Sequence, residues 1–357
     1  MLKESLYRDL ALQGKYDGIP NISSLFNKYV PAFPRDELFL YSAHSSVGKT
    51  TLVKNIYVFN LIEHAIQNKT PLKIEWIALE ESERQFRYTI QSYLLYKRYG
   101  LRLSMMDFES IAIDVNGRRR ILSEYELKCI ISIQEELELY LSYISLPNIA
   151  TPDSILNHIL NVAFQYGVFV LKGKELTREE VNNKKWDFYK RKDDINIIVV
   201  IDPVNRLLDD GGNDTKYKAI ERLFNYLKFY ANLQFGFHVA VSQQQAKELQ
   251  SLDNIKANNF YPSEFGLADY KSSFNDCTTF IGLTNPIRYK IKNWNGYKLE
   301  ELGSFFRVIN IEKNRYGKIT STEQEMIPVL FDGCTGYLER CDGYSTVYQK
   351  LKKIISD

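Results

Sequence analysis

The sequence has few of the residues that build disulfide or zinc scaffolds. Its 357 residues include four cysteines and four histidines, and neither set shows the spacing of a metal site. Such sparse thiols are typical of reduced, structural cysteines in a cytosolic protein. No apolar run approaches the roughly 18 residues that a membrane span requires, and the first residues lack the pattern of a signal peptide. We therefore expect a cytoplasmic protein with no membrane partner.

The sequence also lacks a strong charge of either sign. The formal net charge is +2, which is too small to indicate a nucleic-acid binder by itself, so any basic surface must be local. Hydrophobic residues make up 45% of the chain and charged residues 25%, a balance that allows a substantial core. The chain shows no internal repeat and no low-complexity stretch.

The most distinctive segment is a loop of small residues that follows the apolar run 38–41. It reads Ala43-His44-Ser45-Ser46-Val47-Gly48-Lys49-Thr50-Thr51 and leads into a helical pattern. In such a loop backbone N–H groups surround phosphate oxygens, Lys49 can reach the β- and γ-phosphates, and the Thr50 hydroxyl can hold Mg²⁺. The dipole of the following helix adds positive potential. The pattern predicts nucleotide binding; the alternative is a plain strand-turn-helix connection.

From residue 36 onward, apolar runs alternate with helical patterns. This alternation predicts an α/β fold with a mostly parallel central sheet flanked by helices on both faces. The predicted strands are 37–42, 73–79, 142–146, 196–201, 237–242, 277–283, 305–311 and 327–331, and the predicted helices are 50–67, 82–98, 123–139, 152–166, 215–232 and 343–355. We expect one elaborated domain over residues 18–357.

Three segments fit this alternation less well. Residues 1–17 carry leucines at helical spacing and predict a short, linker-like amphipathic helix, packed either on its own domain or on a neighbouring subunit. Segments 99–122 and 168–194 are charged, and we expect surface insertions there. A solvated face is the default interpretation of such charge runs, and nucleic-acid contact is the alternative.

Two apolar strands end in carboxylates. Residues 197–201 are all β-branched and lead to Asp202, so we expect a buried central strand with Asp202 at its carboxyl end, where open α/β sheets bind ligands. There Asp202 can hold the Mg²⁺ water shell; the alternative is a carboxylate that caps a turn. The strand 73–79 leads to Glu80 and Glu81. Glu80 is a candidate general base for the attacking water, whereas Glu81 can cap the next helix.

Two later strands end in other polar groups. The strand near residue 240 ends in Ser242-Gln243, and an amide at that edge can sense a γ-phosphate by hydrogen bonding without adding charge. The strand near residue 309 leads to Lys313-Asn314-Arg315. Two cations two residues apart on an extended segment point the same way and could reach one phosphate together. In a monomer they would be exposed charges, whereas in a ring they could enter the neighbouring site as an arginine finger.

Taken in order, these segments resemble the RecA-type motor domain of replicative hexameric helicases of the DnaB type, helicase superfamily 4. The resemblance covers about residues 18–332. The stretches that carry it are Gly18-Ile19-Pro20, 43–51, Leu79-Glu80, Thr151-Pro152, Asp202, Ser242-Gln243 and 313–317. That family also opens its phosphate loop with Ala, as Ala43 does here.

The resemblance implies roles for individual residues. Lys49 and Thr50 would bind phosphates and Mg²⁺, with Asp202 as the second Mg²⁺-site residue. Glu80 would be the catalytic glutamate, and Gln243 would couple the nucleotide state to the DNA-binding loops. Lys313 and Arg315 would act in trans, on the ATP bound by the adjacent subunit.

The family's DNA-binding loops would correspond to residues 209–216 and 266–276. The first contains Gly211-Gly212, a mobile turn. The second offers Lys271, Ser272 and Ser273 as donors to a phosphate backbone.

The sequence departs from the family in three places. Only the helix predicted at 1–17 precedes the motor domain, where the family has a helical domain that recruits primase. Pro203 replaces the Tyr that normally follows the Mg²⁺-site Asp, and the family's Arg-Glu-Ser-Gly-like loop has no clear counterpart near residues 267–270.

The sequence therefore predicts an ATP-dependent DNA helicase or translocase that forms a hexameric ring on single-stranded DNA. A primase or a loader protein would be a further partner. The host would be a bacterium, with a phage or mobile-element origin plausible from the short N-terminal region. One alternative is a recombinase-like or regulatory ATPase that assembles on nucleic acid or a protein as a switch without unwinding. Another is a structural subunit that binds nucleotide without hydrolysing it.

Overall fold

The structure of the chain is a computed structural model. The structure describes residues 18–113, 117–183, 185–192, 194–211, 215–256, 260–315, 317–341 and 343–356. The helix predicted for residues 1–17 lies outside the described residues. Gly212 of the first predicted DNA loop and Tyr316 of the 313–317 motif lie outside them as well.

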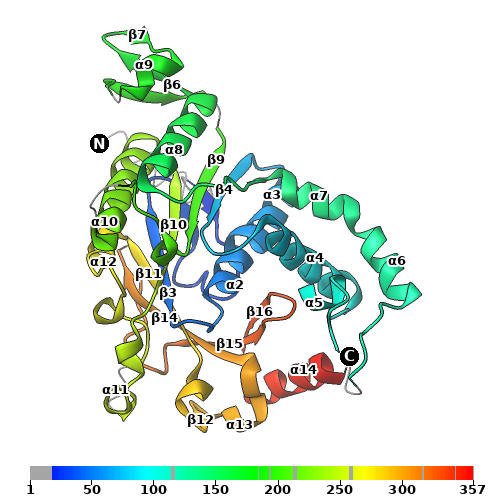
Figure 1. The fold of residues 1–357 in the computed structure, drawn as a ribbon. Helices are drawn as coiled ribbons and strands as arrows, with labels where there is room; N and C mark the ends of the chain where they lie inside the picture. The colour runs from blue at the N-terminus through cyan, green and yellow to red at the C-terminus, as the bar shows by residue number, and fades with distance from the viewer. Residues whose placement is uncertain are drawn as a thin grey trace.

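A twisted central sheet organises the molecule (Figure 1). Within the described residues it has nine strands in the order β16-β15-β14-β11-β3-β10-β9-β4-β5. The strands from β11 to β5 run parallel to one another, and β14, β15 and β16 are antiparallel. The parallel strands are β3 (Leu38–Ala43), β4 (Leu72–Ala78), β5 (Ile144–Ser145), β9 (Asn196–Asp202), β10 (His238–Gln244) and β11 (Thr279–Thr284); the others are β14 (Phe306–Asn314), β15 (Ile327–Asp332) and β16 (Tyr337–Arg340).

Helices cover both faces of this sheet, as Figure 1 shows. On one face lie α2 (Lys49–Lys54), the π-helical η1 (Asn55–Asn60), α3 (Leu61–Asn68), α4 (Glu83–Tyr99), α6 (Glu124–Ser132) and α7 (Gln134–Ser142). On the other lie α8 (Pro152–Tyr166), α10 (Lys216–Tyr226) and the π-helical η3 (Leu227–Gln234). The remaining elements are short: β1 (Gly18–Pro20), β2 (Ala32–Pro34), α5 (Met105–Phe108), β6 (Gly167–Leu171), β7 (Lys174–Glu175), α9 (Arg178–Asn182), β8 (Phe188–Arg191), η2 (Val204–Arg206), η4 (Lys247–Gln250), α11 (Leu252–Lys256), η5 (Glu264–Gly266), α12 (Ser273–Asp276), η6 (Pro286–Tyr289), β12 (Asn293–Trp294), β13 (Tyr297–Lys298), α13 (Leu299–Leu302) and η7 (Gly303–Phe305), followed by the terminal α14 (Tyr344–Ser356).

The two faces of the sheet bury two separate cores. On β3, Phe39 and Tyr41 pack with the α2 and α4 side, whereas Leu38 and Leu40 pack with the α8 and α10 side. Every residue of β9 is buried. This pattern explains why the parallel strands are continuous apolar runs, because a strand covered on both faces has no solvent-facing side chains. It also places the ends of these strands at one edge of the sheet, the carboxyl edge.

Local sequence signals set the ends of the main helices. Ser82 and Gln85 form a reciprocal capping box at the start of α4, and Gly100 (φ 70) ends that helix in a left-handed conformation. Thr151 caps α8, with Pro152 at the first helical position. Both helix starts lie at the carboxyl edge, so capping also positions the segments that follow β4 and β5.

Most predicted elements are confirmed. β3, β4, β5, β9, β10, β11, β14 and β15 match the predicted strands, and the helices predicted at 50–67, 82–98, 152–166, 215–232 and 343–355 are present. The single helix predicted at 123–139 is wrong, because α6 and α7 meet at Ile133 (φ −93, ψ −1). This break leaves Cys129 and Leu137 both in the core.

The two charged segments have structure of their own. Residues 167–191 form a small sheet in the order β7-β6-β8, which Figure 1 shows beyond the end of α8, away from the central sheet. Phe169 anchors it by ring contacts with Trp186 and Phe235. In the other segment, Arg120 pairs with Glu126 (2.6 Å) and Asp107. This arginine therefore serves an internal contact; the interpretation of both segments as insertions stays a prediction.

The antiparallel end of the sheet carries a third cluster. Val347, Leu351 and Ile354 recur at helical spacing in the helix predicted at 343–355. In α14, Val347 and Leu351 are buried against Trp294 and Phe306. The side chain of Ile354 lies outside the described residues. No helix in the described ranges is both long and apolar enough to cross a membrane.

Candidate active site

The loop after β3 brings Lys49 and Thr50 to the carboxyl edge of the sheet. Lys49 begins α2. In the loop before it, the side chains of Ala43 and Val47 are buried, whereas Ser45 and Ser46 are exposed. Positive φ angles at residues 46 and 48 (60° and 109°) interrupt the otherwise negative φ values. Such alternation turns successive N–H groups into a concavity that suits an anion.

The antiparallel strands support this loop from behind. Arg307 of β14 donates a hydrogen bond to the Val47 carbonyl oxygen (2.8 Å), and its guanidinium lies 4.3 Å from the centre of the Phe331 ring. Burial lowers the pKa of Arg307 to about 10. The same Phe331 ring packs against Gly48, where a Cβ atom would lie 2.3 Å from a ring carbon. Phosphate-loop geometry therefore depends on residues that lie 260 positions or more later in the chain.

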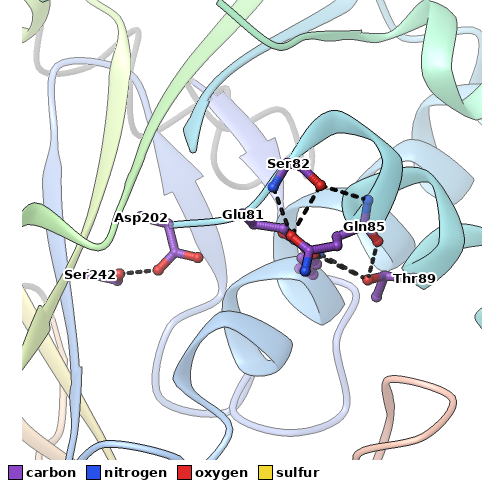
Figure 2. A network of polar contacts seen from close by, with 7 residues as sticks. Glu81, Ser82, Gln85, Thr89, Asp202 and Ser242 are labelled. Carbon is purple, nitrogen blue, oxygen red and sulfur yellow. Dashed lines mark hydrogen bonds and ion pairs between the residues drawn. The ribbon is translucent and has the colours of Figure 1, made fainter. Parts of the chain in front are cut away.

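Lys49, Asp202 and Ser242 meet at the ends of three adjacent strands. The Lys49 ammonium lies 2.9 Å from Ser242 Oγ and 3.4 Å from an Asp202 carboxylate oxygen. The Ser242 hydroxyl donates to the same carboxylate, as Figure 2 shows. Asp202 is 4% exposed. The register explains this meeting, because β10 lies between β3 and β9 and all three run the same way.

Glu80 lies between two cavities that flank the phosphate loop. One, of ≈ 460 Å³, is lined by residues that include Thr50, Glu80 and Asp202. The other, of ≈ 560 Å³, is lined by residues that include Ser46, Lys49, Thr50 and Glu80. The Glu80 side chain is half-exposed and accepts a hydrogen bond from Arg206 (3.0 Å). A phosphate group on the loop would therefore have a carboxylate within the adjoining space.

The donor set fits Mg²⁺ bound together with phosphate oxygens. Among the described residues, no group of three or more His, Cys, Asp or Glu side chains could hold a metal ion alone. Mg²⁺, however, usually takes one or two protein ligands, with substrate phosphates and waters completing its shell. The Thr50 hydroxyl makes no hydrogen bond within the described residues, and the Asp202 carboxylate is buried beside the same cavity. These are the two ligands that the sequence predicts.

A second acidic residue, Glu81, is tied down beside Glu80. Lys54 of α2 places its ammonium 2.6 Å from the Glu81 carboxylate and 3.1 Å from the Thr89 hydroxyl. Figure 2 shows Glu81, which precedes α4, near Thr89 of that helix. Lys54 was not predicted from the sequence. Its signal was present there, since it is a lysine four residues after Thr50 that directly follows the apolar pair Leu52-Val53.

Gln243 points away from the phosphate loop. Its amide nitrogen donates to the carbonyl oxygens of Ala268 (2.6 Å) and Tyr270 (2.9 Å), and its amide oxygen accepts from the Ser273 hydroxyl (2.6 Å). The next residue, Gln244, is the one that lines the larger cavity. Alternation along β10 accounts for this difference, because successive side chains of a strand point to opposite faces. Gln243 thus joins β10 to the 266–276 segment.

Lys313 and Arg315 lie at the edge of the sheet opposite to the phosphate loop. The backbone N–H of Arg315 bonds to Thr278, whose own N–H bonds to Leu38 at the start of β3. Leu38 and Ala43 are five residues apart on β3, which is roughly 16 Å along the strand at about 3.3 Å per residue. The Lys313 ammonium lies 2.5 Å from the Phe274 carbonyl oxygen, and burial lowers its pKa, with the Arg315 charge adding to that shift. Neither side chain can reach the phosphate loop of its own chain.

The two segments predicted to hold DNA are linked to each other. Asp269 (φ 64) pairs with Lys216 (3.1 Å) and accepts a hydrogen bond from Asn205 (2.6 Å). Lys271 is exposed, in keeping with its predicted role. For Ser273 the prediction is wrong, because its side chain is fully buried and its hydroxyl binds Gln243. The sequence placed Ser273 in a surface loop, but in the structure Ser273 begins α12 and its side chain is buried.

The fold matches two solved structures. One, a structure of an ATPase domain, superposes with a TM-score of 0.64 at 15% identity, over 96% of this chain and 99% of that one. The other, "The Structure Of A DnaB-Like Replicative Helicase And Its Interactions With Primase", gives a TM-score of 0.58 at 16% identity, over 94% of this chain and 66% of that one. The chain has the RecA-like α/β fold of these two structures. No protein-family model and no curated protein sequence matches it.

The RecA-like sheet accounts for which predicted residues come together. Lys49, Thr50, Glu80 and Asp202 converge at the carboxyl edge. Thr51 also lines the smaller cavity. Three cations of the larger cavity were not predicted from the sequence, and these are Arg206, Lys216 and Lys247. Pro203, which departs from the family pattern, follows Asp202 through a cis peptide bond and lines that cavity too.

Proposed function

We propose that this protein is an ATP-dependent DNA helicase or translocase of the replicative hexameric type. The observation that carries the proposal is the convergence of Lys49, Thr50, Glu80 and Asp202 around the phosphate loop of a RecA-like sheet. A loop that suits phosphate, two oxygen ligands for Mg²⁺ and a nearby carboxylate are the parts that nucleotide hydrolysis requires.

Each residue would have a distinct task. The N–H groups of residues 45–50 and the Lys49 ammonium would bind the β- and γ-phosphates, and Thr50 and Asp202 would hold Mg²⁺. When bound, Mg²⁺ neutralises charge on the phosphate oxygens. Glu80 would orient the attacking water and take its proton. The present partners of Lys49 and Glu80 are side chains that a triphosphate and its water can replace.

The position of Arg315 supports hydrolysis at a subunit interface. Because Lys313 and Arg315 lie at the opposite edge of the sheet, only another copy of the chain could bring them to a phosphate loop. An interface of that kind is head-to-tail, and head-to-tail contacts that close form rings. We infer a homo-oligomer, with a hexamer as the expected state, in which Arg315 and Lys313 stabilise charge on the transferred phosphoryl group.

Movement along DNA would depend on segments 209–216 and 266–276. Lys216 and Lys271 would contact the phosphate backbone of single-stranded DNA. Gln243 would couple them to the nucleotide, because it follows Ser242 on β10 and holds the second segment by its carbonyl groups. A net charge of +2 fits a ring whose basic surface is confined to its channel.

Further partners follow from the same proposal. A primase or a loader protein would meet the ring in the cytoplasm of a bacterial host, whether the protein is bacterial or from a phage or mobile element. One structural neighbour, the DnaB-like replicative helicase, is described with its interactions with primase, which makes a primase the first partner to try.

The proposal is tested by steady-state ATP hydrolysis with and without single-stranded DNA, with Lys49→Ala as the blank. We expect turnover that depends on Mg²⁺ and increases several-fold with DNA, followed by displacement of a strand from a forked duplex. Turnover absent from the wild-type protein contradicts the proposal.

A second candidate function is an ATPase switch that assembles on nucleic acid or a protein without unwinding. The buried Ser273 favours it, because one of the three predicted DNA donors of the 266–276 segment is turned inward. ATP turnover that is slow and indifferent to DNA, with no strand displacement, would select this function.

A further inference from the structure

Lys54 is a buried cation that the proposed mechanism does not use. It is 1% exposed, its ammonium contacts the Glu81 carboxylate (2.6 Å) and the Thr89 hydroxyl (3.1 Å), and it lies 4.4 Å from the centre of the Phe86 ring. Burial lowers the pKa of Lys54, and the Glu81 carboxylate opposes that shift. The cation thus depends mainly on the Glu81 carboxylate for its charge, with a smaller contribution from Asp202.

Stability does not explain why such a pair is present. Removing an ammonium from water costs several kcal/mol, and replacing a buried ion pair by well-packed apolar residues is often neutral or stabilising. An apolar pair would also suit the surroundings, since Phe86 and the helix residues Leu52 and Val53 are fully buried. A buried ion pair does, however, hold two elements in one relative position, because any shift leaves both charges without a partner.

The two elements that this pair joins are those of the proposed reaction. Lys54 lies four residues after Thr50 on α2, so the two side chains share one face of the helix. Glu81 follows Glu80 directly, at the turn between β4 and α4. All four residues line the ≈ 460 Å³ cavity, together with Asp202. Thr89 completes the tie, because its hydroxyl also donates to the Gln85 carbonyl oxygen of α4 (3.0 Å).

We propose that the Lys54–Glu81 ion pair is a positioning device that holds Glu80 at a set distance from Thr50. This inference rests on the proposed hydrolytic function and adds two residues to it. Lys54 acts through Glu81, since its ammonium is directed to that carboxylate and away from solvent. The physical basis is that a misplacement of about 1 Å at the reacting groups can cost on the order of 100-fold in rate.

The test compares Lys54→Met, Glu81→Gln and the double variant Lys54→Met/Glu81→Met. Met keeps the length of the lysine side chain and removes its charge. Lys97→Met is the matched control. Like Lys54, Lys97 forms an ion pair that joins two helices on this face of the sheet, here α4 and α3 through Glu63, and its ammonium lies over an aromatic ring, that of Tyr93. For each protein we measure kcat and KM for ATP, the Kd of a fluorescent ATP analogue, and the melting temperature.

We expect the double variant to melt at or above the wild-type temperature and to bind the analogue within about two-fold of the wild-type Kd, while its kcat falls about 10- to 100-fold. Both single variants should lose kcat to a similar extent, and Lys97→Met should keep it. A double variant with wild-type kcat overturns the inference, because the pair would then be structural only. An equal loss in Lys97→Met also overturns it.

The same experiment separates this inference from the proposed function. If the wild-type protein hydrolyses ATP and the double variant is equally active, only the role of the ion pair fails. If the wild-type protein shows no turnover above the Lys49→Ala blank, the proposed function fails, and the positioning role fails with it.

Discussion

At the scale of single residues, the site is built from side chains that already have partners which a nucleotide could replace. Lys49 lies against Ser242 and Asp202, and Glu80 lies against Arg206. The Glu80–Arg206 pair is largely exposed on both sides, and such surface pairs contribute at most about 1 kcal/mol. It is therefore weak enough to open when substrate arrives.

The first prediction concerns Glu80. Glu80→Gln keeps the shape of the side chain and removes its basicity, so ATP turnover should fall by roughly 100- to 10,000-fold. Binding of a fluorescent ATP analogue should stay within a few-fold of wild type, because the phosphate loop is unchanged. Arg206→Ala serves as the control and should keep the melting temperature of the wild-type protein. Substantial turnover by Glu80→Gln would assign the general base to another residue.

The second prediction concerns pH and stability. Burial lowers the pKa of His238 to about 4, and its ring is neutral because Nδ1 donates to the Pro34 carbonyl oxygen while Nε2 accepts from Tyr57. In the unfolded chain the pKa is near 6.5, so between pH 6.5 and 4 the unfolded state binds more protons. The free energy of unfolding should therefore fall by up to about 3 kcal/mol from this residue as the pH decreases through that window.

Urea titrations at pH 7.0, 5.5 and 4.5 measure this slope. His238→Gln should flatten it, because Gln offers hydrogen bonds without titrating. Some slope should remain, since burial lowers the pKa of His44 to about 4 as well. An unchanged slope in His238→Gln would mean that His238 does not titrate with unfolding.

At the scale of elements, the phosphate loop depends on strands that come late in the chain. Gly48 has φ 109, and a Cβ atom there would overlap the Phe331 ring of β15. Arg307 of β14 holds the Val47 carbonyl oxygen from the same side. The antiparallel strands carry no predicted Mg²⁺ ligand, and their predicted phosphate contact Lys313 lies at the opposite edge, yet they support the phosphate loop from behind.

The third prediction compares two glycines with positive φ. Gly48→Ala should abolish binding of the ATP analogue and lower the unfolding free energy by about 1–3 kcal/mol from backbone strain, with a further loss from the overlap with Phe331. Gly100→Ala is the control, because Gly100 has φ 70 and a Cβ atom added there would meet no other atom within 4 Å. It should cost about 1 kcal/mol and leave nucleotide binding intact. Equal effects at both positions would rule out a role for the Phe331 contact.

At the scale of the whole molecule, the sheet separates the two halves of the proposed site. Lys49 lies at the carboxyl edge, and Arg315 lies at the opposite edge, because β14 runs antiparallel to its neighbour β11. A single chain therefore contains every proposed part of the hydrolytic site yet cannot assemble them by itself.

The fourth prediction tests assembly between chains. Arg315→Ala and Lys49→Ala should each lose ATP turnover, the first with nucleotide binding retained. When the two proteins are mixed, the Lys49→Ala chains supply Arg315 to intact phosphate loops of Arg315→Ala chains, so turnover should reappear. Turnover by Arg315→Ala alone, at the wild-type level, would contradict the role in trans.

A large part of the fold could be predicted because its signals are local. Apolar runs that end in Asp202 and Glu80 mark buried strands and their functional ends, and the loop 43–51 has its own pattern. The small sheet at 167–191 could not be predicted, because its strands are short and its anchor is Phe169, which packs against the distant Phe235. The break at Ile133 was hidden for a similar reason: helical spacing continues through it, and only packing shows the change of direction.

The candidate site divides in the same way. Lys49, Thr50, Glu80 and Asp202 were found from the sequence because each follows or ends an element with a recognisable pattern. Lys54 was not found, because its partner Glu81 is brought to it only by the packing of α4 on α2. The sequence assigned the γ-phosphate-sensing amide to Gln243, but it is Gln244 that lines the larger cavity. The side that each residue of a strand faces depends on how the sheet is covered, which the sequence pattern did not show.

By itself, the sequence determined where most of the central strands and flanking helices lie and which residues are candidates for binding phosphate and metal, because hydrophobic periodicity, capping and turn residues act over a few positions. Only the tertiary structure decided that β9 and β10 lie beside β3 while Arg315 is carried to the far edge. Strand order and direction come from burying both faces of the sheet at once, and that requirement joins residues hundreds of positions apart, which no local pattern records.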